Sequence, residues 1–130
     1  MSAKTLIVED RPEIQTLIRS TLEFEGHDPH TADDGADGWR LAQTLRPDLV
    51  LLDIMMPGDL DGLQVCERIR APPALSATRV VLPSARGRQS DRAAGAAVGC
   101  DAYLTKPFSP LELIETVETM LSTSAGAPAR

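Results

Sequence analysis

The sequence predicts an α/β domain built on a parallel sheet, and two features of its pattern lead to this prediction. Short apolar runs rich in Val, Ile and Leu recur along the chain, at residues 6–8, 49–52, 80–82 and 102–104. The segments between them carry apolar residues at the three- and four-residue spacing of a helix face. Almost wholly apolar strands that alternate with amphipathic helices are typical of a parallel sheet covered on both faces.

The first helix is expected to open with Pro12 in its first turn and to end at Gly26. A strand over residues 27–32 contains Pro29, which cannot donate a ladder hydrogen bond, so this strand is expected at a sheet edge. Periodicity predicts that the buried face of the first helix is made of Ile14, Leu17, Ile18 and Leu22.

Three further helices are expected over residues 36–45, 62–70 and 89–98. The last of these is rich in Ala and Gly and has few large apolar anchors, so it is the helix expected to move. The final helix has Ser109 as N-cap, with a capping box and a buried stripe predicted from Pro110, Glu112, Leu111, Ile114, Val117 and Leu121. Residues 1–122 are thus expected to fold, and 123–130 to form a flexible tail or linker stub.

Composition limits the function classes. At 130 residues the chain has room for one domain, and its formal charge of −6 disfavours direct binding to nucleic acid or to an anionic membrane. No apolar run has the length of a membrane span or of a secretory signal, so a cytoplasmic location is expected. Metal-ligand spacing is absent around Cys66 and Cys100, which are expected to be reduced thiols, and around His27 and His30, which are expected at the surface.

Reactive side chains follow four of the apolar runs. The carboxyl ends of neighbouring parallel strands converge on one crevice, which is where such sheets bind ligands. The residues expected to meet there are Glu9, Asp10, Asp53, Ser84, Lys106 and Pro107. Three carboxylates close together repel one another, and a hard divalent cation relieves that repulsion. We therefore expect Mg²⁺ or a similar ion such as Mn²⁺.

The residue types suggest how the metal is held and what it serves. Asp10 and Asp53 suit direct ligation, Glu9 suits contact through water, and the backbone carbonyl of Met55 is a further candidate oxygen. An ionised Asp53 needs no general base to attack phosphorus, so an aspartyl phosphate is the expected product. Phosphoryl transfer requires positioning and charge neutralisation, which the cation, Lys106 and the Ser84 hydroxyl would supply.

These motifs, in this order and spacing, resemble the receiver domain of two-component response regulators over residues 4–122. They are Glu9-Asp10, the segment 52–58 (Leu-Asp-Ile-Met-Met-Pro-Gly), Ser84-Ala85 and the run 103–108 (Tyr-Leu-Thr-Lys-Pro-Phe). The resemblance implies a doubly wound (βα)5, flavodoxin-like sandwich with a five-stranded sheet of order 2-1-3-4-5, as in chemotaxis receivers. It also implies Mg²⁺-dependent transfer to Asp53 from a sensor histidine kinase or a histidine phosphotransfer protein.

The same resemblance assigns several further roles. Lys106-Pro107 would be the family's cis peptide, and Tyr103 its rotating aromatic switch residue. Met55 and Arg86 hold positions that modulate hydrolysis of the aspartyl phosphate. Phosphorylation would change the face made of the fourth helix, fifth strand and fifth helix. That face would control a partner or output domain, and the family often forms homodimers through it; the sequence leaves dimerisation open.

The chain departs from the usual pattern in two places. One extra residue, taken as Asp59, separates Asp53 from Asp61, and Pro83 precedes the switch hydroxyl of Ser84. Two other classes fit less well. A haloacid dehalogenase-like phosphatase would carry a second Asp at position 55, and a flavodoxin would need a glycine-rich loop after the first strand. A signalling domain, not a metabolic enzyme, is the favoured reading, either alone or as one part of a longer regulator or hybrid kinase.

Overall fold

The computed structural model describes residues 3–54, 58, 60–85 and 89–122, with backbone alone at 84–85 and 89–92. Within these described residues, five strands and five α-helices alternate, with a short 3-10 helix, η1 (Pro73–Leu75), before the fourth strand. The strands are β1 (Lys4–Val8), β2 (Asp28–Ala32), β3 (Leu49–Leu52), β4 (Arg79–Ala85) and β5 (Ala102–Lys106). The helices are α1 (Pro12–Phe24), α2 (Gly35–Leu45), α3 (Gly62–Arg70), α4 (Gln89–Ala97) and α5 (Pro110–Ser122).

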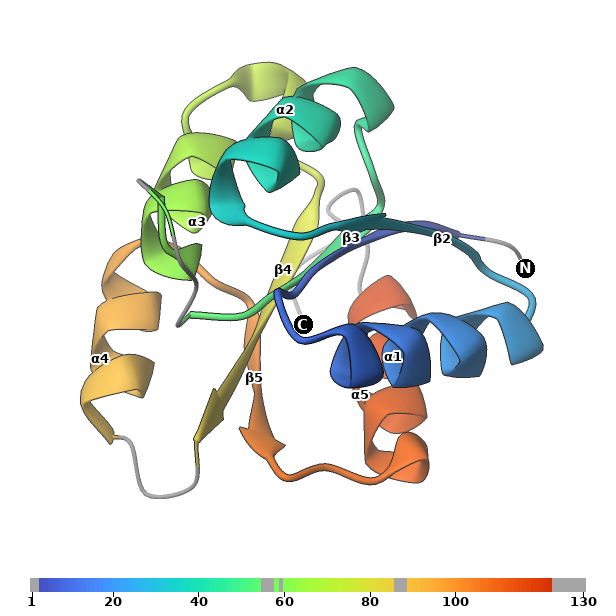
Figure 1. The fold of residues 1–130 in the computed structure, drawn as a ribbon. Helices are drawn as coiled ribbons and strands as arrows, with labels where there is room; N and C mark the ends of the chain where they lie inside the picture. The colour runs from blue at the N-terminus through green and yellow to red at the C-terminus, as the bar shows by residue number, and fades with distance from the viewer. Residues whose placement is uncertain (1–2, 55–57, 59, 86–88, 123–130) are drawn as a thin grey trace.

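All pairs of neighbouring strands are parallel, and their order across the sheet is β2-β1-β3-β4-β5 (Figure 1). This confirms the predicted fold class. β2 lies at an edge, as Pro29 predicted, and the central strand β3 is buried along its whole length. The chain places β2 on one side of β1 and then β3, β4 and β5 on the other side. The switch point, where such sheets bind their ligands, therefore lies between β1 and β3.

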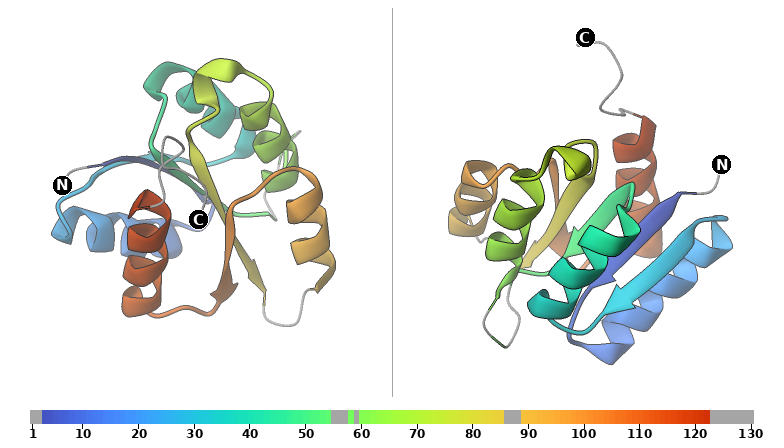
Figure 2. Two further views of the ribbon diagram at one scale, coloured as in Figure 1. Left: turned by 180° about the vertical axis from the view of Figure 1, so that it is seen from behind. Right: turned by 90° about the horizontal axis from the view of Figure 1, so that it is seen from above.

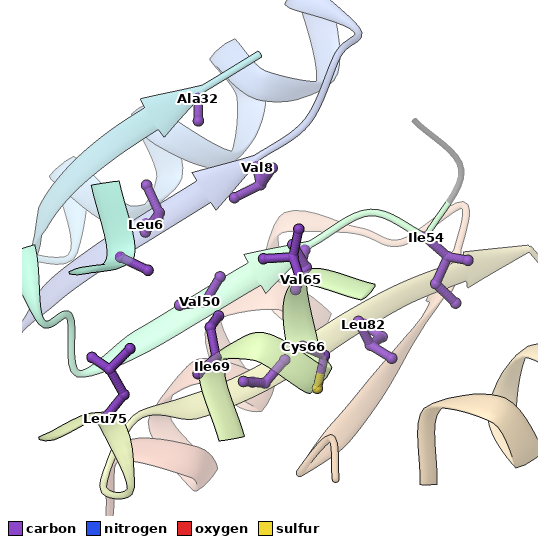
Figure 3. Close-up of a cluster of buried hydrophobic side chains, with 13 residues drawn as sticks. Leu6, Val8, Ala32, Val50, Ile54, Val65, Cys66, Ile69, Leu75 and Leu82 are labelled. Carbon is purple, nitrogen blue, oxygen red and sulfur yellow. The ribbon is translucent and has the colours of Figure 1, made fainter. Parts of the chain in front are cut away.

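Helices cover both faces of the sheet. One apolar cluster joins the sheet to α2 and α3, and Figure 3 shows Val65, Cys66 and Ile69 of α3 facing Val50 and other strand residues. α4 lies on this side too (Figure 1). A second cluster joins the other face to α1 and α5, which lie beside each other in Figure 2.

The predicted buried faces of α1 and α5 were wrong at two positions. Leu17 is 41% exposed and Leu111 is 63% exposed. The buried face of α1 is centred on Ile18 and Leu22, and that of α5 on Leu113 and Val117. Each of these pairs is four residues apart, so Leu17 lies at the side of the α1 face and Leu111 lies two residues, or about 200°, from Leu113.

His27 is buried, which contradicts its expected place at the surface. β2 begins one residue later, so the alternation of side chains along a strand does not apply to His27. Its Nδ1 accepts the backbone N–H of Ala3 at 3.2 Å, and its Nε2 lies 3.4 Å from a carboxylate oxygen of Glu118. His30 is partly exposed and lies 3.1 Å from a carboxylate oxygen of Asp28.

The predicted capping box of the last helix is confirmed. The Ser109 hydroxyl accepts the N–H of Glu112 at 3.1 Å, and the Glu112 carboxylate accepts the N–H of Ser109 at 3.0 Å. Cys66 and Cys100 are free thiols, and burial raises the pKa of Cys66 to about 12. Among the residues that the structure describes, no helix is long and apolar enough to cross a membrane.

Candidate functional site

The site begins where β1 and β3 end. Val8 and Leu52 are paired across these strands, so the residues that follow them, Glu9 and Asp53, lie side by side. The Asp53 N–H donates to the Val8 carbonyl at 3.1 Å, and the Glu9 N–H donates to the Ala32 carbonyl of β2 at 3.1 Å. Backbone hydrogen bonds to two adjacent strands, β1 and β2, therefore fix both acids at the carboxyl edge of the sheet.

Three carboxylates and one ammonium group meet at this edge. Carboxylate oxygens of Glu9, Asp10 and Asp53 all lie within 4.8 Å of one another. Glu9 and Asp53 are only 2% and 6% exposed, whereas Asp10 is exposed. Lys106 places its Nζ 3.1 Å from Asp53 Oδ1 and 3.7 Å from Glu9 Oε1.

Among the described residues, one cation faces three acids at this edge, so the site is short of positive charge. Burial and, next in size, the neighbouring Asp53 carboxylate together raise the pKa of Glu9 from 4.5 to about 7, against the opposing effects of the Arg11 N–H and Lys106. All the candidate ligand atoms are oxygens, which Mg²⁺ prefers. The donor set and its unbalanced negative charge therefore fit a hard divalent cation.

The structure describes the remaining predicted site residues to different extents. Lys106 ends β5, and its peptide bond to Pro107 is cis. Ser84 is paired with Thr105 inside β4, so this strand is longer than the run 80–82 suggested; only the backbone of Ser84 is described. The expected roles of Met55, Asp59 and Arg86, and of the tail 123–130, fall on residues outside the described part of the chain.

Pro83 fits the sheet because of where the pairing of β4 changes. The last residue of β4 paired with β3 is Val81, whereas pairing with β5 continues through Pro83 to Ala85. Beyond Val81 the strand has only β5 as a paired neighbour, so a donor missing on the β3 side breaks no ladder hydrogen bond.

Tyr103 lies between the sheet and α4. Its side chain packs against the apolar cluster on that face, and a β-carbon built on Gly95 of α4 would lie 2.9 Å from the Tyr103 hydroxyl. The absence of a side chain at Gly95 therefore makes room for the ring. The predicted switch residue thus touches the helix that the sequence marked as weakly anchored.

Sequence reasoning missed two supporting residues. Gln15 of α1 donates its side-chain amide to the Glu9 carbonyl at 3.0 Å and to the Asp33 carboxylate at 3.0 Å, which links the ends of β1 and β2. Gly62 packs so closely on Asp53 that an added β-carbon would overlap the Asp53 carbonyl oxygen. A polar residue on a helix and a glycine at a helix start are too common to reveal these contacts in advance.

The family model described as "Response regulator receiver domain" matches residues 5–118. The chain belongs to this family. Aspartate phosphorylation is the general function of receiver domains, which are signalling domains of two-component systems and generally bind Mg²⁺ at an acidic pocket.

Relatives of this receiver include transcription regulators and other receivers. The alkaline phosphatase synthesis transcriptional regulatory protein PhoP of Bacillus subtilis is 38% identical over 95% of this chain and 50% of its own length. The chain spans about half the length of the curated relatives it matches.

Solved receiver structures share the fold. Chemotaxis protein CheY4 of Vibrio cholerae has a TM-score of 0.87 and 29% identity, with 93% of this chain and 100% of that chain covered. The signal receiver domain of a signal transduction histidine kinase from Syntrophus aciditrophicus has a TM-score of 0.87 and 27% identity, with 98% and 96% covered. A chemotaxis protein and the receiver domain of a histidine kinase therefore both match this chain over nearly all its length.

Proposed function

We propose that Asp53 accepts the phosphoryl group in this receiver, from a sensor histidine kinase or a histidine phosphotransfer protein. The observation that carries the proposal is the position of Asp53, 3.1 Å from Lys106 and within 4.8 Å of Glu9 and Asp10 at one edge of the sheet. Of the three carboxylates, Asp53 lies nearest to the Lys106 ammonium, at 3.1 Å against 3.7 Å for Glu9.

Asp10 and Asp53, with the Met55 carbonyl, would ligate Mg²⁺ or Mn²⁺ directly, and Glu9 would act through water. When bound, the ion supplies positive charge to the phosphoryl oxygens. An Asp53 oxygen attacks phosphorus in line with the P–N bond of the phosphohistidine; the new O–P bond forms as the P–N bond breaks, and the imidazole leaves with its electron pair. Lys106 remains beside Asp53 and offsets the charge that arrives.

The proposed switch runs through Ser84, Lys106 and Tyr103. A phosphoryl group adds about −1.5 to −2 charge, which attracts the Ser84 hydroxyl and the Lys106 ammonium. Since Tyr103 already lies against Gly95 of α4, a change at the end of β4 reaches the α4–β5–α5 face through this ring. That face would bind a partner, an output domain or a second copy of the chain.

The output is proposed to lie outside residues 1–122. The related PhoP carries the name of a transcriptional regulatory protein, and this chain covers 50% of its length. A DNA-binding output would then contact DNA through other residues, because the −6 charge of this chain disfavours contact with phosphates. A receiver attached to a histidine kinase is a second candidate, favoured by the Syntrophus match.

Incubation with acetyl phosphate, with and without Mg²⁺, tests the proposal. Intact mass should show a gain of one phosphoryl group in the wild type that requires Mg²⁺ and is absent in Asp53→Asn. A gain that persists in Asp53→Asn would place the phosphoryl group elsewhere. No gain in the wild type with Mg²⁺ would contradict autonomous phosphorylation at this site.

A further inference from the structure

The first turn of α2 lies directly against the chain that follows Asp53. Gly35 opens α2 and is buried, and a β-carbon built on it would overlap the Leu60 carbonyl oxygen and lie 2.8 Å from the Leu60 carbonyl carbon. Real β-carbons do not approach backbone atoms this closely, and a backbone carbonyl cannot turn aside as a flexible side chain can. The approach of α2 to Leu60 therefore depends on glycine.

A second close approach continues from Leu60 to Asp53. Gly62, two residues after Leu60, donates its N–H to the Ile54 carbonyl at 3.1 Å. A β-carbon on Gly62 would lie 2.8 Å from both the Asp53 carbonyl carbon and the Ile54 α-carbon. Gly62 thus rests on the backbone of the residue proposed to accept the phosphoryl group.

Helix caps fix the first turns of α2 and α3, the two helices that these contacts join. The Asp34 carboxylate accepts the N–H of Asp37 at 2.9 Å and fixes the start of α2. Asp61 and Gln64 form a capping box, with both hydrogen bonds at 2.9 Å, and fix the start of α3. The contacts from Gly35 through Leu60 and Gly62 to Asp53 therefore join two helix starts that each have a fixed geometry.

We propose that Gly35 is a positioning residue for the acidic site: by seating the first turn of α2 on Leu60, it holds Gly62 against Asp53 and sets the place of the Asp53 carboxylate. α2 itself supplies none of the proposed ligands. The inference rests on the proposed function only where phosphorylation is the readout, because cation binding and the Gly62–Ile54 hydrogen bond can be measured without it.

Gly35→Ala is the direct test. Displacing Leu60 should weaken Mg²⁺ binding, measured by calorimetry, and slow phosphorylation by acetyl phosphate, each by about fivefold or more, since small misplacements at a reacting centre have large effects. Hydrogen exchange of the Gly62 amide should rise by about tenfold as its bond to Ile54 weakens. Val117→Ala is the matched control, because it lowers stability through the core beneath α5, on the opposite face of the sheet.

A gentler pair of variants guards against misfolding of Gly35→Ala. Asp34→Ala removes both the charge and the N-cap of α2, whereas Asp34→Ser removes the charge and keeps a capping oxygen. Asp34→Ala should weaken Mg²⁺ binding and speed Gly62 exchange in the same direction as Gly35→Ala, by about twofold. Asp34→Ser should stay close to the wild type.

The outcomes separate the two ideas. The positioning role is wrong if Gly62 exchange and Mg²⁺ affinity in Gly35→Ala match those of Val117→Ala, or if Asp34→Ala and Asp34→Ser behave alike. A wild type that binds Mg²⁺ but gains no phosphoryl group would count against the proposed function alone. If the wild type bound no Mg²⁺, exchange at Gly62 would still decide whether Gly35 positions the segment after Asp53.

Discussion

Lys106 Nζ lies 3.1 Å from Asp53 Oδ1 and 3.7 Å from Glu9 Oε1, so one ammonium group serves two buried carboxylates. The Lys106 side chain is itself only 23% exposed. Its positive charge offsets part of the free-energy cost of burying both carboxylates. The same ammonium can stay paired with Asp53 when the charge on Asp53 changes.

Lys106→Met should reduce the rate of phosphorylation by acetyl phosphate at saturating Mg²⁺ by about tenfold to a hundredfold, because a positioned cation is lost where charge develops. Intact mass against time measures this rate. Lys4→Met is the control, because Lys4 is the other lysine of the chain. Its ammonium donates to the carbonyl of Leu45, at the end of α2, and α2 carries none of the acidic site residues. Equal rates in the two variants would show that Lys106 takes no part in transfer.

Glu9→Gln should change how stability depends on pH. With a pKa of about 7 when folded and 4.5 as its ordinary value, Glu9 binds more protons in the folded state between these values. The free energy of unfolding of the metal-free wild type therefore falls as pH rises from about 4.5 to 7, and stays lowered above 7. At pH 8 in EDTA, Glu9→Gln should be more stable than the wild type by roughly 1–3 kcal/mol, and at pH 4 nearly equal.

Urea unfolding at both pH values measures this difference. Mg²⁺ at pH 8 should stabilise the wild type and remove much of the advantage of Glu9→Gln, because the ion binds the ionised carboxylates. The exposed Glu115→Gln is the control and should show no such pH-dependent gain. A Glu9→Gln variant that is less stable than the wild type at pH 8 without metal would contradict the raised pKa.

Arg70→Met should destabilise the fold strongly. The Arg70 guanidinium donates to the Gly99 carbonyl at 2.7 Å and to the Thr78 carbonyl at 2.8 Å, and it pairs with Asp101. Removing it leaves a partly buried carboxylate and two carbonyls with fewer donors, at a cost of about 2–4 kcal/mol.

The control for Arg70 is Arg40→Met. Arg40 pairs with Asp37 at 3.2 Å, but both side chains are more than half exposed, at 68% and 51%. Exposed pairs contribute about 0–1 kcal/mol, so this variant should unfold near the wild-type urea midpoint. Similar midpoints for the two variants would show that the Arg70 contacts are no stronger than a surface pair.

Gly95→Ala should displace the ring of Tyr103. The new β-carbon would lie 2.7 Å from Leu82 Cδ1 and 2.9 Å from the Tyr103 hydroxyl, so a neighbour must move. Tyr103 is the only tyrosine of the chain, so its ring gives a single set of signals in NMR with labelled tyrosine. Those signals should shift in Gly95→Ala and stay in place in Ala96→Ser, an exposed position on the same helix. Unchanged signals in Gly95→Ala would mean that the helix moves and the ring does not.

Local patterns predicted most of the fold because each helix and strand carries its own signal. The apolar run 49–52 became a fully buried strand, and Ser109 with Glu112 formed the predicted capping box. Leu17 and Leu111 were assigned wrongly because periodicity identifies a helix but not the angle at which its neighbours cover it. His27 was missed because its partners, Ala3 and Glu118, are distant in sequence.

The acidic cluster followed from a rule about where parallel strands end, and the structure brings Glu9, Asp10 and Asp53 together as that rule expects. The contacts that support the cluster were less visible in the sequence. Gly35 and Gly62 act through the absence of a side chain against a distant backbone, which leaves no periodic signal.

The Arg70 contacts lie at the end of α4 remote from the acids. Arg70 donates to the Gly99 carbonyl just after α4, and the Cys100 N–H donates to the Gly95 carbonyl at 3.0 Å, so the last turn of α4 is tied to α3. Because that end is held, any tilt of α4 would pivot near Gly99. α4 has 9 residues and is about 13 Å long, so a tilt of about 10° moves its first turn by roughly 2 Å and its last turn hardly at all. A partner that distinguishes the two states of this receiver through α4 would find the largest difference at the amino-terminal half of the helix.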